Sequence, residues 1–193
     1  MCTSGKTALL GLIIRDVLLQ PFHEKVHLRD KEVNVMSLKA AMWVHGTIVE
    51  VEYPRNLDGD LIDGLARKGW GTYFWGKENT TNWFHIPITT PVILDGVRPQ
   101  LEKVFVFYKT DGWTKITNIH VYDGVRTVKE FNGLALSGAH HDGIDAENGW
   151  EINPPITILY GLGISVGVDF GPHVQEGWPA ILFTTAGADF KEP

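Results

Sequence analysis

The sequence predicts an all-β protein, an antiparallel two-sheet sandwich of jelly-roll type, on two observations. The first is the stretch Ile156–Phe170 (ITILYGLGISVGVDF), in which every even position is large and apolar. From Gly161 onward the odd positions are glycine, serine or aspartate, and only a β-strand gives a period of two. The second is a series of shorter segments with strand-like composition, separated by turn residues and without a convincing amphipathic helix. A closed β-barrel is the alternative.

The two faces of the long predicted strand differ in what they can contact. The apolar face has to cover a core, whereas the glycine-lined face is reduced nearly to backbone. Glycine in a strand often marks a close approach by a ligand or by another chain. We therefore expect something to lie against this second face.

The chain divides into an N-terminal extension, residues 1–35, and one β-sandwich domain, residues 36–193. Ala8–Leu19 (ALLGLIIRDVLL) predicts a short helix in the extension. A signal peptide is disfavoured because the apolar run is short, charged residues follow it at once and no A-x-A cleavage site appears.

The strands of the domain are expected from their alternation and from the turns between them. They are Thr47–Tyr53, Gly69–Trp75, Asn82–Ile88, Leu101–Lys109, Thr114–Tyr122, Val125–Phe131, Trp150–Ile152, Ile156–Phe170 and Ile181–Phe190. Turn signals at 110–113 and 123–124 predict a three-stranded meander over 101–131. Pro87 favours an edge position for its strand, and Pro54–Lys68 is expected to be a loop with one helical turn.

Composition excludes several classes of function. The net charge is −6 and no run is rich in lysine or arginine, so neither nucleic acid nor a membrane is an expected partner. The single cysteine, Cys2, cannot form an internal disulfide, which favours a cytoplasmic over a secreted protein. No dinucleotide or phosphate-binding motif appears in a strand–helix context, so we expect no cofactor.

Seven tryptophans are the unusual feature of the composition. Either they fill and cap the sandwich core, or some line a groove in which aromatic faces stack on a ring-shaped ligand. Three strand-like segments alternate a histidine with an aromatic residue, and such histidines can orient a ligand or transfer a proton. The candidate ligand-binding residues are Trp83, Trp75, Tyr73, His45, Trp43 and Tyr122; the candidate catalytic residues are His85, His120, Glu50 and Asp169.

Three further features of the sequence have an ordinary structural explanation beside a functional one. The loop Gly138–Gly149 is rich in histidine and carboxylate groups, which suits either a solvated polar loop or a cation site, but it matches neither an EF-hand nor a cupin, so no metal ligand is assigned. The similar strand ends VGVDF and AGADF suggest that Asp169 and Asp189 are neighbours. Ser165 lies in G-I-S-V-G, but no helix follows, so the nucleophile elbow is excluded.

The blocks WVHGTIVEVEYP, NWFHIPI, HVYDG and GLGISVGVDF resemble a family of small microbial proteins, bacterial and fungal, of uncharacterised function. The resemblance covers about Met42 to Phe190. It implies a compact single-domain all-β protein and carries over no catalytic residue.

These features favour a β-sandwich that binds a carbohydrate or another small cyclic molecule in an aromatic-lined groove. The alternative is a cofactor-free enzyme, such as a cyclase or isomerase of secondary metabolism, in which a histidine transfers a proton inside an apolar cavity. A third hypothesis is a structural or self-associating protein, because an edge strand and a glycine-lined face are compatible with a homo-oligomer.

Overall fold

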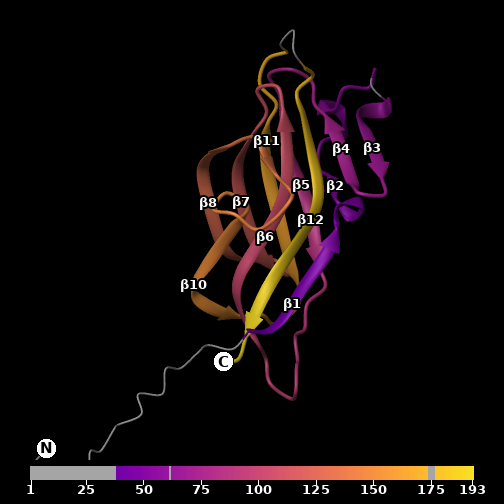
Figure 1. The fold of residues 1–193 in the computed structure, drawn as a ribbon. Coiled ribbons are helices and arrows are strands. Elements are labelled where there is room, and N and C mark those ends of the chain that lie inside the picture. The colour runs from indigo at the N-terminus through magenta and orange to yellow at the C-terminus, as the bar shows by residue number, and fades with distance from the viewer. Residues whose placement is uncertain (1–37, 61, 174–176) are drawn as a thin grey trace, which may run out of the picture. The chain divides into compact units, whose positions relative to one another are not determined.

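The computed structural model describes residues 38–60, 62–173 and 177–193 (Figure 1). The predicted extension, including the helix expected over Ala8–Leu19, lies outside these residues. The described chain forms two antiparallel sheets that face each other and do not close into a barrel. The two-sheet sandwich of jelly-roll type is therefore confirmed, since the chain passes back and forth between the two sheets along its length.

The first sheet, sheet A, is built around β6 and β12, which pair along most of their length. One edge of β12 pairs with β4 and then with β1, and the far edge of β6 pairs with β9 and β10. Its strands are β1 (Leu38–His45), β3 (Leu65–Lys68), β4 (Gly71–Trp75), β6 (Gln100–Asp111), β9 (Ala139–His140), β10 (Gly149–Thr157) and β12 (Ala180–Lys191).

The second sheet, sheet B, has the order β2-β5-β11-β7-β8, so β11 is its central strand. Its strands are β2 (Glu50–Val51), β5 (Thr81–Ile88), β7 (Lys115–Asp123), β8 (Arg126–Leu136) and β11 (Leu162–Asp169). Three 3₁₀ turns, η1 (Gly46–Ile48), η2 (Pro54–Asn56) and η3 (Ile62–Gly64), connect the early strands. Among the described residues, no helix has the length and apolar character needed to cross a membrane.

The core lies between the sheets and follows the predicted alternation. On β11, Ile164 and Val166 are completely buried against sheet A, whereas Ser165 between them points outward. Phe74 of sheet A contacts Phe84 of sheet B with ring centroids 4.7 Å apart, and Phe183 lies 5.3 Å from Phe84. Each such ring contributes about 1.5–3 kcal/mol by burial, so these contacts hold the sheets together at their centre.

The single long strand predicted over Ile156–Phe170 is wrong. The chain leaves sheet A at the end of β10, turns over residues 158–161, and enters sheet B at the start of β11. The buried carboxylate of Asp123 holds this turn by accepting the backbone N–H groups of Leu159, Tyr160 and Gly161 at 2.8–3.1 Å. Ile158 remains buried in the turn, but Tyr160 is 75% exposed, so the apolar alternation of the sequence continues across the break although the alternation of burial does not.

The predicted meander over 101–131 is also wrong in its first half. β6 lies in sheet A and β7 in sheet B, so the turn between them crosses the sandwich and does not close a hairpin. Only the hairpin of β7 and β8, joined at Asp123 and Gly124, is formed as expected. Turn residues predict that a chain reverses, but the partner of each strand is decided by the other strands in its sheet.

Two early segments differ from expectation as well. The strand predicted over Thr47–Tyr53 is a 3₁₀ turn followed by the two-residue β2. The chain changes sheet at Gly46, where an added Cβ would lie 2.0 Å from the Phe183 carbonyl oxygen. The loop predicted over Pro54–Lys68 contains β3. The edge position expected for the strand of Pro87 is wrong, because β5 lies between β2 and β11; β2, however, pairs only with residues 84 and 85, so Pro87 lies beyond that pairing.

Candidate functional site

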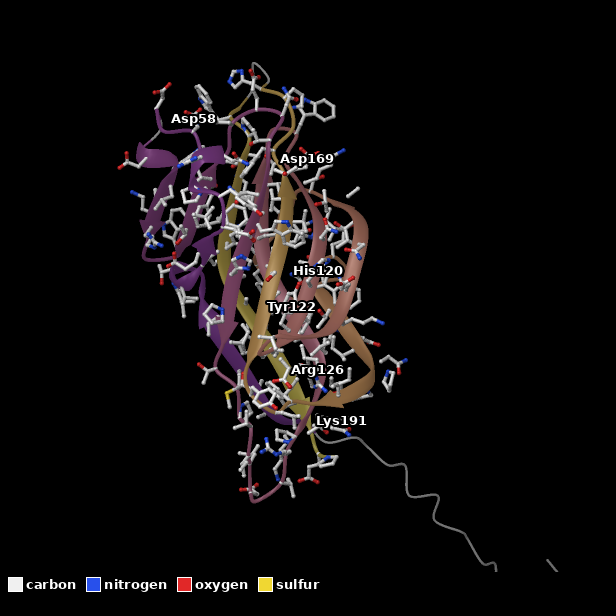
Figure 2. The ribbon with its side chains drawn as sticks, turned by 180° about the vertical axis from the view of Figure 1, so that it is seen from behind. Asp58, His120, Tyr122, Arg126, Asp169 and Lys191 are labelled. Atoms are coloured by element: carbon white, nitrogen blue, oxygen red, sulfur yellow. The ribbon has the colours of Figure 1, made fainter. Side chains whose placement is uncertain are left out.

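The outer surface of sheet B gathers polar and aromatic side chains around the glycines of β11. The register places Ser165 opposite both His85 and His120, Gly167 between Trp83 and Asn118, and Gly163 between Pro87 and Tyr122. Figure 2 shows His120 and Tyr122 beside the central strand, midway along the sheet. We call this surface the sheet B face; it comprises Glu52, Trp83, His85, Asn118, His120, Tyr122, Asn132, Gly163, Ser165 and Gly167.

A hydrogen-bonded relay crosses three strands at one side of this face. His85 Nε2 lies 2.9 Å from Glu52 Oε2, and His85 Nδ1 lies 2.9 Å from Ser165 Oγ. A carboxylate only accepts hydrogen bonds, so Nε2 carries a proton, and in the neutral form of the ring Nδ1 accepts from the Ser165 hydroxyl. Glu52 also accepts from the Tyr53 hydroxyl, and this hydrogen bond raises the pKa of Tyr53 above its ordinary value.

A second network lies across Ser165 from the relay. The Trp83 ring contacts His120 with centroids 4.8 Å apart, and His120 Nε2 lies 2.7 Å from Asn132 Oδ1. Asn118 Nδ2 donates to the same oxygen at 2.6 Å. Because this amide oxygen only accepts, it fixes the proton of His120 on Nε2 and leaves Nδ1 facing the Tyr122 hydroxyl at 3.5 Å.

The two glycines that flank Ser165 have different surroundings. A Cβ added at Gly167 would lie 3.0–3.2 Å from atoms of Asn118 and Trp83, so glycine allows the indole to lie close over the strand. A Cβ added at Gly163 would meet no atom within 4 Å. The sheet B face is therefore covered on the Gly167 side of Ser165 and open on the Gly163 side.

Two candidate catalytic residues do not meet His85. The Glu50 carboxylate pairs with Arg67 at 3.3 Å, and it is Glu52, not among the candidates predicted from the sequence, that contacts the histidine. The alternation placed both glutamates on the same face, but gave no sign of which one reaches His85. Asp169 accepts the backbone N–H of Gly171 at 3.0 Å at one end of β11 (Figure 2).

The expected proximity of Asp169 and Asp189 is wrong. Asp169 ends β11 in sheet B, whereas Asp189 lies in β12 of sheet A, opposite Lys103. Burial and the nearby charge of Glu102 raise the pKa of Asp189, and the charge of Lys103 opposes them. The similar strand ends VGVDF and AGADF therefore do not create a pair of carboxylates.

Four of the predicted ligand-binding residues lie on sheet A, across the sandwich from Trp83. Tyr73 and Trp75 stack with centroids 5.5 Å apart, and Trp43 stacks on Phe105 at 5.1 Å. His45 receives the backbone N–H of Thr47 on Nδ1 and so caps η1. Because packed sheets are about 10 Å apart, one small ligand cannot contact both sets. The structure therefore divides the predicted groove between two opposite surfaces.

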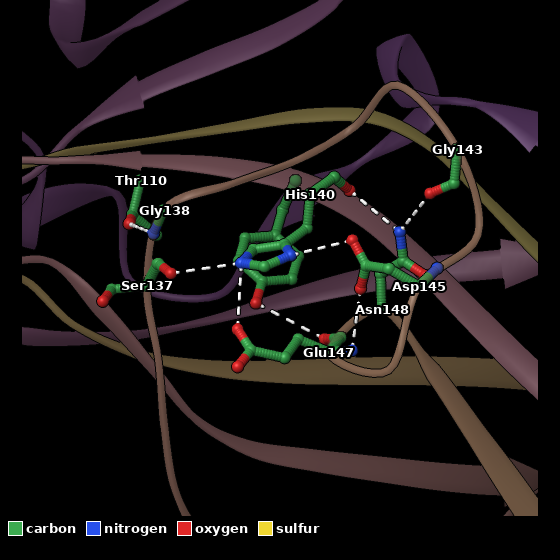
Figure 3. A network of polar contacts seen from close by, with 9 residues as sticks. Thr110, Ser137, Gly138, His140, Gly143, Asp145, Glu147 and Asn148 are labelled. Atoms are coloured by element: carbon green, nitrogen blue, oxygen red, sulfur yellow. Dashed lines mark hydrogen bonds and ion pairs between the residues drawn. The ribbon is translucent and has the colours of Figure 1, made fainter.

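The loop rich in histidine and carboxylates folds around His140 (Figure 3). His140 Nδ1 lies 2.9 Å from Asp145 and Nε2 lies 2.9 Å from Glu147, while the ring contacts Tyr108 at 5.2 Å. Burial lowers the pKa of His140, but the hydrogen bonds to Asp145 and to the Ser137 carbonyl raise it above its ordinary value. Burial raises the pKa of Tyr108.

The contacts of His140 stabilise the conformation of its own loop. Both ring nitrogens of His140 are occupied by residues of its own loop, and Asn148 donates to the His140 and Gly143 carbonyls. In the described part of the chain, no group of three or more histidine, cysteine, aspartate or glutamate side chains is arranged to hold a metal ion. The histidine and the carboxylates therefore close the loop on itself.

These observations define the class of protein: a two-sheet β-sandwich with an open polar and aromatic surface on its five-stranded sheet. The chain belongs to a Family of unknown function (DUF6623), whose model matches residues 37–176. No curated protein sequence matches it. Among solved structures, it is similar to an exo-beta-1,3-galactanase from Phanerochaete chrysosporium, crystallised with galactose, at 9% identity and a TM-score of 0.35. The match covers 79% of this chain and 30% of the galactanase chain.

Proposed function

We propose that the sheet B face binds a small cyclic polyhydroxylated molecule, a carbohydrate or a compound of similar shape. The observation that carries this proposal is the Trp83 indole lying over Gly167 beside a set of hydrogen-bonding groups with defined orientations. An aromatic face provides a flat apolar surface for a ring, and the fixed polar groups select its substituents.

The open space over Gly163 supports a ligand position. Gly163 lies between Pro87 and Tyr122 and next to Ser165 along β11. A ligand ring resting there has the Trp83–His120 pair at one end and the Tyr122 hydroxyl at its side. Since the surrounding side chains are held by one another, they lose little conformational freedom when a ligand binds.

The exposure of the relay favours binding over the cyclase or isomerase alternative. The side chains of His85 and Glu52 are 44% and 38% exposed, so this pair lies on an open surface. A reaction that holds a flexible substrate in a reactive conformation needs a site closed to water. The cytoplasmic location and the homo-oligomer remain predictions beside this proposal.

The test is a titration of the purified protein with neutral, amino and uronic-acid hexoses and their disaccharides, followed by calorimetry and tryptophan fluorescence. We expect dissociation constants on the order of 1 mM or tighter for at least one class. Trp83→Ala should weaken that binding roughly tenfold or more, because stacking on the indole is lost.

Trp70→Ala is the matched control, because Trp70 is 52% exposed and contacts Tyr73 on sheet A. It should leave the affinity unchanged. If Trp70→Ala removes binding and Trp83→Ala does not, the ligand site is on sheet A and the proposal is wrong. No heat and no fluorescence change with any sugar would equally refute it.

A further inference from the structure

We propose that Ser165 is a nucleophile activated by His85, and that the sheet B face transfers acyl groups from small esters. The arrangement that points to this is the series Ser165–His85–Glu52, in which His85 lies 2.9 Å from Ser165 and 2.9 Å from Glu52. Ser165 belongs to β11 and His85 to β5, and Glu52 directly follows β2. A serine, a histidine that accepts its proton and a carboxylate that orients the histidine form the general unit of serine nucleophiles.

The protonation derived for His85 is the one this chemistry requires. Glu52 holds the proton on Nε2, so in the neutral ring the Nδ1 lone pair is directed at the Ser165 hydroxyl. Glu52 acts as a positioning residue, because its carboxylate bonds to the histidine and to the Tyr53 hydroxyl and reaches Ser165 through the histidine alone. The serine is not a nucleophile elbow: it lies inside β11, and its partners come from other strands.

Access to Ser165 comes from the side of Gly163. The residue itself is 8% exposed, and Trp83 and Asn118 close the Gly167 side. At Gly163, no atom lies within 4 Å of the position that a Cβ would take, so an ester group can approach along the strand from that direction. If the ester is that of a cyclic molecule, its ring rests where the proposed function places the ligand. The inference rests on the proposed function for this ring position alone.

The step balances without an added oxidant or cofactor. Ser165 Oγ attacks the ester carbonyl carbon while its proton passes to His85 Nδ1. The carbon–oxygen bond to the alcohol breaks, and the leaving alcohol takes that proton. Water then attacks the acyl-serine, gives its proton to Nδ1 and releases the carboxylic acid, after which Ser165 recovers its proton.

The stabilisation of the oxyanion has to come from side chains. β11 has a strand on each side, so its backbone N–H groups are used by the two ladders. We assign this role to the Tyr122 hydroxyl, because Tyr122 is paired with Gly163 and its hydrogen bond to His120 Nδ1 is long at 3.5 Å, so it can be exchanged for one to the oxyanion. A single side-chain donor predicts slow turnover, since each missing oxyanion donor costs about 100-fold or more.

The experiment is labelling of the full chain with a small alkyl fluorophosphonate, followed by intact mass and peptide mapping. We expect one adduct, on Ser165, and none with Ser165→Ala. His85→Gln should slow labelling about 100-fold or more. Ser137→Ala, at an exposed serine beyond β8, is the control and should label normally.

Glu52 is tested by its conservative variants. Glu52→Gln should slow labelling about tenfold while the melting temperature stays unchanged, and Glu52→Asp should restore part of the rate. No adduct on the wild-type protein, or an adduct that persists in Ser165→Ala, would overturn the proposal. The two proposals fail separately: Trp83→Ala should bind sugar more weakly and still be labelled, and Ser165→Ala should lose labelling and still bind sugar.

Discussion

Replacing Asp123 with asparagine should destabilise the domain, although the two side chains have the same shape. Asp123 is completely buried and accepts three backbone N–H groups from the turn at 159–161. Arg126 also pairs with its Oδ2 at 3.2 Å. In the variant, one carboxylate oxygen becomes an NH₂ group, which turns a donor toward the Leu159 N–H. A buried donor left without a partner costs about 1–3 kcal/mol, and a hydrogen bond to a charged group is worth about 1.5–3 kcal/mol.

We therefore expect a loss of about 3 kcal/mol in the free energy of unfolding. For a domain of this size, each kcal/mol lowers the melting temperature by roughly 2–4 °C, so the shift should be about 10 °C. The measurement is urea unfolding at pH 7 followed by tryptophan fluorescence. Asp60→Asn is the control, because Asp60 is exposed. A loss below about 0.5 kcal/mol would refute the role of Asp123 in holding the turn.

The same variant makes a prediction about pH. Burial alone raises the pKa of Asp123, but the three backbone N–H groups and Arg126 lower it below its ordinary value. A carboxyl group with a lowered folded-state pKa stabilises the protein above its unfolded pKa of about 3.9, and this stabilisation is lost as the pH falls through the folded pKa. The difference between wild type and Asp123→Asn should therefore be constant near neutrality and shrink on acidification below about pH 4. A constant difference at pH 3 would contradict the assignment.

Three further predictions concern other parts of the structure. The pKa of His140 is raised, so its charged form stabilises the loop below pH about 6.5, and this contribution is lost as the pH rises through the folded-state pKa. His140→Gln should therefore flatten the pH dependence of the melting temperature above pH about 6.5. Gly167→Ala should displace the Trp83 indole, seen as a shifted emission maximum and about tenfold weaker sugar binding, whereas Gly163→Ala should leave the emission unchanged. Trp43→Ala should lower the free energy of unfolding in urea by about 2 kcal/mol, because it uncovers Phe105 and Phe107. This loss is smaller than the usual cost of removing a buried tryptophan, because Trp43 is partly exposed.

The candidate site could be predicted from the sequence only in part. Alternation put Trp83 and His85 on one face, and likewise His120 and Tyr122, because both pairs are two residues apart within a strand. It could not indicate that these pairs flank Ser165, because that depends on the pairing of β5 and β7 with β11. For the same reason it grouped Trp75 with Trp83, although their strands lie in different sheets.

The sequence by itself determined the fold class and most strand positions, because a period of two along the chain is a local property set by one face being buried. It also determined that the odd positions of β11 are small, which leaves Ser165 between two glycines. Only the tertiary structure decided where the chain changes sheet, at Gly46, at the β6–β7 turn and at the turn held by Asp123. It alone chose Glu52 over Glu50 as the partner of His85: register places Glu50 opposite His85, but the Glu50 carboxylate pairs with Arg67 of β3, a contact that alternation along one strand does not reveal.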